Sequence, residues 1–80
     1  MRGIYSGFRL RHGEFYVRTG DVFRNRDGNT VEILDCEPLD FFGEVNRDAW
    51  CIYAFNGKGE YNKTLGDMLT WLESWGYEAL

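Results

Sequence analysis

The sequence predicts an α+β fold, in which an antiparallel sheet of about five strands packs against one C-terminal amphipathic helix. Three observations support this prediction: short apolar stretches alternate at the period of a strand, strong turn signals separate them, and the end of the chain changes to helical spacing. A chain of 80 residues has room for one hydrophobic core, so we expect a single domain over residues 1–80.

The first predicted element is a hairpin near the N-terminus. Residues 4–11 alternate between apolar and polar, and His12-Gly13 can form a two-residue turn. In this register Leu10 faces Phe15 on the core side, and Tyr16 lies on the outer face opposite Arg9.

A second hairpin is predicted from residues 22–24 and 30–36. Between them lies Arg26-Asp27-Gly28, in which Gly28 can take the positive φ that a three-residue loop requires. This register places Phe23 opposite Val31.

The third predicted pair follows from residues 50–55, which are apolar on both faces and therefore suit a strand in the interior of the sheet. The segment Asn56-Gly57-Lys58-Gly59 is a strong turn signal. We expect the chain to return from this turn through Glu60-Tyr61.

The helix is predicted near the C-terminus. Thr64 can cap its first turn, where Asp67 is favoured by the helix dipole, and Gly76 can take the position after the last turn. Its apolar face is expected to consist of Leu65, Met68, Leu69, Leu72 and Trp75.

The sequence carries no arrangement that points to catalysis, so we predict that the protein is not an enzyme and has neither cofactor nor metal. No nucleophile elbow, phosphate-binding glycine loop or cluster of metal ligands is present. His12 is expected to be an exposed turn residue, and Cys36 and Cys51 are expected to be buried thiols. No stretch is long enough to span a bilayer and no signal peptide is visible, which predicts a cytoplasmic protein.

Charge is distributed unevenly along the chain. The net charge is −4, yet residues 1–26 carry six arginines against two acids, whereas residues 27–80 carry eleven acids against three basic residues. Such asymmetry predicts an acidic face that suits a basic partner. The candidate partner-binding residues are Glu32, Asp35, Glu37, Asp40, Phe41, Phe42, Glu44 and Asp48.

Phe41 and Phe42 interrupt this acidic stretch, and two interpretations are open. The rings could fold back into the core, because so small a domain needs its aromatic residues inside. Alternatively they could be exposed anchors that fill a pocket on the partner while the surrounding carboxylates meet lysines and arginines.

An alternative function uses the arginine-rich N-terminal part of the chain. Basic residues interleaved with aromatic rings can hold single-stranded nucleic acid, although the net negative charge makes direct binding less favourable. The candidate residues for this nucleic-acid face are Arg9, Arg11, Tyr16, Arg18 and Arg24.

In its length, in the acidic run from Asp27 to Asp48 and in its aromatic-rich strands ending in Thr64 to Trp75, the chain resembles the small, acidic, single-domain proteins that bacteriophages and other mobile elements encode against host defences, anti-CRISPR proteins among them. The resemblance implies inhibition by binding, in which the acidic face occupies a basic nucleic-acid-binding surface of a host effector. The expected partner is therefore a basic host protein or nucleoprotein, bound by a monomer or a dimer.

Overall fold

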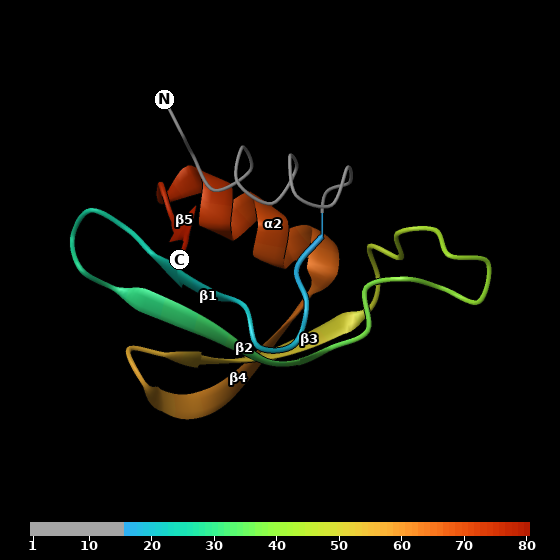
Figure 1. Cartoon of the computed structure of the whole chain (residues 1–80), viewed down its shortest axis with the longest axis horizontal. Helices are drawn as coiled ribbons and strands as arrows, with labels where there is room; N and C mark the ends of the chain where they lie inside the picture. The colour runs from blue at the N-terminus through green and yellow to red at the C-terminus, as the bar shows by residue number, and fades with distance from the viewer. Residues whose placement is uncertain (1–15) are drawn as a thin grey trace.

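The computed structural model describes residues 16–80, which form one sheet and one helix (Figure 1). The elements are β1 (Val22–Arg24), β2 (Thr30–Cys36), β3 (Trp50–Phe55), β4 (Lys58–Thr64), α2 (Leu65–Ser74) and β5 (Glu78–Ala79). The predicted segments 4–11 and His12-Gly13 lie outside the described residues.

The five strands form an antiparallel sheet in the order β4-β3-β2-β1-β5, which confirms the predicted α+β class. Helix α2 lies along one face of this sheet and does not cover the opposite face (Figure 1). Two details differ from the prediction. Tyr16 and Val17 are not part of a strand, and the short strand β5 after the helix was not predicted.

The β1–β2 hairpin has the predicted register, with Phe23 opposite Val31. The backbone N–H of Asn25 donates to the carbonyl of Asn29 (3.0 Å), which closes the predicted three-residue loop. Gly28 has a φ of 88°. Glycine adopts this conformation at little energetic cost because it has no Cβ. The side-chain oxygen of the buried Asn25 also accepts hydrogen bonds from two backbone N–H groups of this loop.

The β3–β4 hairpin turns at Asn56-Gly57, within the predicted turn segment, and β4 begins earlier than expected, at Lys58. Both residues have positive φ (53° and 77°), and the flanking residues Phe55 and Lys58 are paired. This geometry is that of a two-residue turn whose twist matches that of the strands. The register then shifts between Tyr53 and Phe55, and Gly59, with a φ of 74°, lies on the strand opposite this shift. This position of Gly59 is that of a glycine bulge next to the turn.

Helix α2 begins and ends as the sequence predicts. The Thr64 hydroxyl accepts the N–H of Asp67 (3.2 Å). At the other end, Gly76 (φ 69°) donates to the carbonyl of Glu73 and Tyr77 donates to that of Leu72, the two hydrogen bonds of a Schellman motif.

The core lies between α2 and the sheet and includes residues that the helical pattern alone did not identify. Trp75 was expected on the apolar face but is 63% exposed, because the helix ends there. Tyr77 is buried in its place, since the left-handed Gly76 redirects the chain toward the sheet. The buried residues of this core are Tyr16, Val17, Phe23, Val31, Ile33, Cys36, Cys51, Tyr53, Leu65, Met68, Leu69, Leu72 and Tyr77.

Candidate partner-binding surface

The segment 37–49 connects β2 to β3 and is the most prominent feature of the surface. In Figure 1 it is the yellow-green loop that extends beyond the end of the sheet, away from the β1–β2 hairpin. It contains six of the eight candidate partner-binding residues, which are Glu37, Asp40, Phe41, Phe42, Glu44 and Asp48. We call this segment the projecting loop.

The tip of the projecting loop is held in one shape by hydrogen bonds within itself. The carbonyl of Asp40 accepts the N–H of Gly43 (3.0 Å), and its carboxylate oxygen accepts the N–H groups of Phe42 (2.8 Å) and Glu44 (3.0 Å). The N–H of Asp40 in turn donates to the carbonyl of Glu44 (2.8 Å). Gly43 has a φ of 81°, so the turn uses an aspartate and a glycine at the positions that favour them.

The base of the projecting loop is attached to the core and to the start of α2. Leu39 and Val45 form an isolated antiparallel bridge and both pack against the core. The carbonyls of Arg47 and Ala49 accept the N–H groups of Gly66 (2.9 Å) and Leu65 (2.7 Å), which are donors in the first turn of the helix. The loop therefore projects from a fixed base.

Phe41 and Phe42 lie at this tip and point away from the core. Their exposed fractions are 96% and 83%, and the two rings meet edge to face with centroids 5.4 Å apart. The interpretation in which they belong to the core is therefore wrong. The sequence signal that distinguishes the two interpretations is the spacing of Asp40 and Gly43, which marks positions i and i+3 of a type I turn with both rings at its centre.

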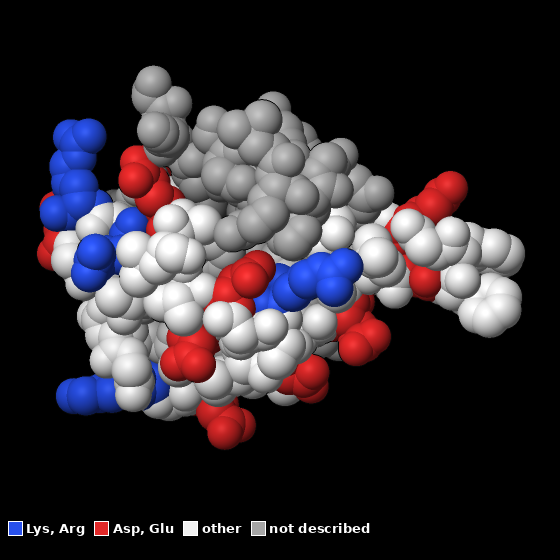
Figure 2. Space-filling model, in the orientation of Figure 1, with Lys and Arg blue, Asp and Glu red and all other residues white. Residues whose placement is uncertain are grey.

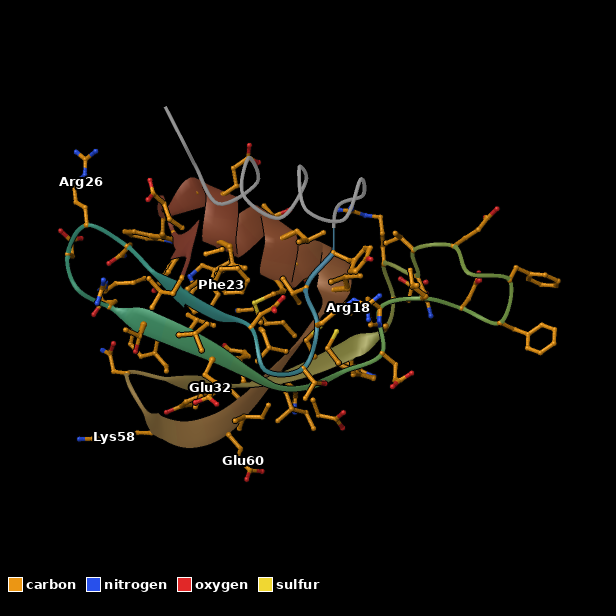
Figure 3. The ribbon with its side chains drawn as sticks, in the orientation of Figure 1. Arg18, Phe23, Arg26, Glu32, Lys58 and Glu60 are labelled. Atoms are coloured by element: carbon orange, nitrogen blue, oxygen red, sulfur yellow. The ribbon has the colours of Figure 1, made fainter. Side chains whose placement is uncertain are left out.

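The candidate carboxylates fall into two groups. Glu37, Asp40, Glu44 and Asp48 are exposed on the projecting loop, and Figure 2 shows acidic side chains along this part of the surface. Glu32 and Asp35 are instead exposed side chains of β2. Figure 3 shows Glu32 and also Glu60, which was not among the candidates, on the side of the sheet away from α2.

The basic side chains of the described residues are divided between the two ends of the molecule. Figure 3 labels Arg26 and Lys58 at the end of the sheet opposite the projecting loop, and Figure 2 shows Lys and Arg side chains there. Arg18 instead lies beside the base of the projecting loop, and Arg47 belongs to the loop itself, so positive charge is present at both ends.

The alternative nucleic-acid face does not assemble as predicted among the described residues. Tyr16, expected on an outer face, is only 5% exposed and belongs to the core. The guanidinium carbon of Arg18 lies 5.2 Å from the centroid of this ring, and an Arg18 nitrogen donates to the Tyr16 hydroxyl (3.3 Å). Arg24 is exposed on β1, where Glu78 is its register partner on β5. Arg9 and Arg11 lie outside the described residues.

A groove of about 300 Å³ lies beside α2 and already contacts a cation. Its lining residues are Tyr53, Phe55, Tyr61 and Trp71. The ammonium nitrogen of Lys63 lies 4.9 Å from the ring centroid of Trp71 and 5.9 Å from that of Tyr53. These distances correspond to cation–π contacts, so two of the rings that line the groove already face a cation of the protein itself.

Cys36 and Cys51 are both free and buried, as predicted. A second hollow, of about 290 Å³, is lined by Cys36 together with Arg18, Thr19, Glu37, Pro38 and Leu39 at the base of the projecting loop. Within residues 16–80, no three His, Cys, Asp or Glu side chains are arranged to hold a metal ion. His12, the one residue that could pair with a thiol as a base, lies outside this range.

Comparisons with known proteins identify no relative: no family model, curated protein or solved structure matches the chain. In residues 16–80, there is no helix with the length and apolar character that crossing a membrane requires.

Proposed function

We propose that this protein is a non-enzymatic protein-binding module that engages its partner through the projecting loop. The observation that carries the proposal is the pair Phe41 and Phe42, which are almost fully exposed at the tip of a hydrogen-bonded turn. Burying a phenylalanine side chain is worth about 1.5–3 kcal/mol, and the fold itself gains none of this from either ring. A partner with an apolar depression would gain it.

The fixed shape of the tip favours binding as well. A loop that is already ordered loses less conformational entropy when it docks than one that must become ordered. Aromatic anchors at the centre of a contact, surrounded by polar groups, are the usual arrangement of an interface hot spot. Here the surrounding groups are the carboxylates of Glu37, Asp40, Glu44 and Asp48.

These carboxylates decide the class of partner. Adjacent exposed phenylalanines also suit insertion into a lipid surface, but anionic headgroups would repel the carboxylates around them. Lysines and arginines around an apolar depression would instead attract them and speed the encounter. The proposed partner is therefore a basic protein.

A narrower proposal follows from the resemblance to inhibitors of phage origin. In it, the partner is a cytoplasmic host effector whose basic surface binds nucleic acid, and the projecting loop excludes that nucleic acid. The test is competition: the protein should displace a labelled oligonucleotide from a captured partner. A complex in which the partner keeps its oligonucleotide would contradict inhibition while leaving protein binding intact.

The experiment that tests the broader proposal is affinity capture from a bacterial lysate at low and high salt, with wild type and three variants side by side. Phe41→Ala/Phe42→Ala removes the anchors, and Glu37→Lys/Glu44→Lys/Asp48→Lys reverses three loop charges while keeping the structural Asp40. The control, Trp75→Ala, removes a ring that is also exposed but lies at the end of α2.

We expect a stoichiometric basic partner for wild type and for Trp75→Ala, and its loss in both loop variants and at high salt. Retention of the same partner by both loop variants would rule the proposal out. Since the two phenylalanines make no core contact, the double variant should unfold at the wild-type temperature, so loss of binding could not be attributed to misfolding.

A further inference from the structure

The face of the sheet opposite α2 carries an apolar stripe among carboxylates. Because directly paired residues share a face, the buried Ile33 and Cys51 assign Tyr53 and Lys63 to the helix side. Alternation then places Trp50, Ile52 and Ala54 of β3 on the opposite side.

A bulge in β2 extends this opposite side. The register passes from Ile33–Tyr53 to Asp35–Ile52, so Leu34 and Asp35 together oppose Ile52. Without the extra residue, strict alternation would turn Asp35 into the core and Cys36 out of it. The bulge leaves Asp35 exposed and Cys36 buried.

The apolar part of this surface is only partly covered by the protein's own side chains. Trp50 is 64% exposed, and Leu34 and Ile52 are half-buried. The exposed carboxylates of Glu32, Asp35 and Glu60 surround them, and Figure 3 shows Glu32 and Glu60 on this side of the sheet. We call these six residues the outer sheet face.

Among residues 16–80, the positive charge that the strands place on this side is that of Arg24, at the far end of the sheet. Arg24 lies on β1, which is separated from β3 by β2. Its register partners are Thr30 of β2 and Glu78 of β5, so a carboxylate lies beside it. Lys58 and Lys63 are register partners of Phe55 and Cys51 and therefore belong to the helix side. The outer sheet face is thus acidic where its apolar stripe is exposed.

We infer that the outer sheet face binds a basic amphipathic helix of a partner protein. An amphipathic helix is the element that covers a sheet face, as α2 does on the other side. Its apolar stripe would cover Leu34, Trp50 and Ile52, and lysines or arginines along its edges would meet the carboxylates. This inference rests on the proposed function only in requiring a protein partner, and it adds a second contact that begins at Trp50, where the projecting loop ends.

The test uses a fluorescein-labelled synthetic helix of leucine and lysine with all leucines on one face, titrated with the full chain and followed by anisotropy. A peptide of the same composition in scrambled order is the probe control. We expect saturable one-to-one binding of the amphipathic peptide only, weakened by added salt.

Two variants examine the surface directly. Trp50→Ala removes the most exposed ring, and Glu32→Gln/Asp35→Asn/Glu60→Gln neutralises the three carboxylates. We expect each variant to bind the peptide about tenfold more weakly, or worse, because one loses a central aromatic anchor and the other loses the charges around it. The charge-matched control, Asp27→Asn/Asp67→Asn/Glu73→Gln, changes exposed carboxylates elsewhere and should bind as wild type does.

The outcomes separate this inference from the proposed function. Phe41→Ala/Phe42→Ala should bind the peptide normally if the outer sheet face is the site. Equal binding by wild type and Trp50→Ala, or by the scrambled peptide, would overturn the inference. Self-association that depends on Trp50, seen by light scattering, would also overturn it, because the occupant would then be a second copy of the chain. Circular dichroism checks that each variant is folded.

Discussion

Cys36 and Cys51 are direct partners across β2 and β3, one residue before the projecting loop begins and two residues after it ends. The Cys51 thiol hydrogen-bonds to the sulfur of Cys36 and so lowers the pKa of Cys36, although burial and the carboxylates of Asp35 and Glu37 act in the opposite direction. The same hydrogen bond, together with burial, raises the pKa of Cys51. The pair therefore shares its first ionisation unequally.

This relationship predicts the pH dependence of alkylation at Cys36. Only the thiolate reacts, so a lowered pKa moves the midpoint of the rate profile to lower pH. Replacing Cys51 by Ala removes the donor and leaves burial and the two carboxylates, so the midpoint should move above the ordinary range of a thiol. Mass spectrometry of the iodoacetamide adduct gives the rate at each pH.

Cys51→Ser is the matched control for this measurement, because its hydroxyl can still donate to the Cys36 thiolate. Its midpoint should lie below that of Cys51→Ala. Identical midpoints in wild type and both variants would contradict the assigned hydrogen bond.

Asp40 is predicted to control local order at the loop tip without affecting global stability. Asp40→Ala removes the acceptor of two backbone N–H groups, each worth about 0.5–1.5 kcal/mol. Hydrogen exchange at the amides of Phe42 and Glu44 should accelerate accordingly, while the unfolding midpoint stays close to that of wild type. Asp40→Asn keeps the acceptor and loses the charge, so it should retain slow exchange. Fast exchange in Asp40→Asn as well would mean that charge, and not the acceptor, orders the turn.

Leu72 is predicted to be a main determinant of stability. It is fully buried on α2, and Leu72→Ala should lower the free energy of unfolding by about 2–5 kcal/mol. Urea denaturation followed by circular dichroism measures this change. The exposed neighbour Glu73 supplies the control, since Glu73→Ala should change stability by no more than about 0.5 kcal/mol. A Leu72→Ala protein as stable as wild type would mean that α2 is not packed as described.

Gly76 is predicted to be required because its backbone has a positive φ, and not because a larger side chain would clash with its neighbours. Its φ is 69°, and a Cβ built there would meet nothing within 4 Å. Gly76→Ala should therefore cost about 1–2 kcal/mol through backbone strain alone. Gly76→Asn should cost less, because asparagine tolerates the left-handed region better. Thermal unfolding of the two variants compares them, and equal, unchanged midpoints would contradict the observed helix end.

Local signals were sufficient for much of the fold. Asn56-Gly57 determines a two-residue turn because both positions need positive φ, and Thr64 determines the helix start because its hydroxyl caps an N–H group that has no partner within the helix. In each case, the physical cause lies within a few residues of the chain, so the sequence contains it.

The errors arise where the cause is a distant contact or a break in periodicity. Trp75 continues the helical spacing, but it lies at the helix end that Gly76 was correctly predicted to form. The chain turns toward the sheet there, and Tyr77 fills the core instead. The bulge at Leu34 and Asp35 was not predicted, because no turn residue indicates it, although Cys36 is buried as expected. Tyr16 was placed by a hairpin register, whereas its burial depends on packing across the whole core.

The sequence predicted most residues of the candidate site, but not how they are arranged in space. Charge counting identified the acidic stretch, because composition does not depend on the fold. It placed Glu32 and Asp35 in one group with Glu37, Glu44 and Asp48 of the projecting loop, although the correctly predicted strand 30–36 already separates the first two from the others. It also did not find Glu60, which joins the first two only through strand pairing.

The internal closure of residues 40–44 has a consequence for how this surface can diversify. Every hydrogen bond described for these five residues has both partners within the segment, and the Leu39–Val45 bridge separates them from the core. The segment can thus be exchanged for another five-residue turn without repacking the frame beneath it. Such a scaffold lends itself to display libraries, in which randomised tips would be selected against new targets while the same sheet and helix are retained.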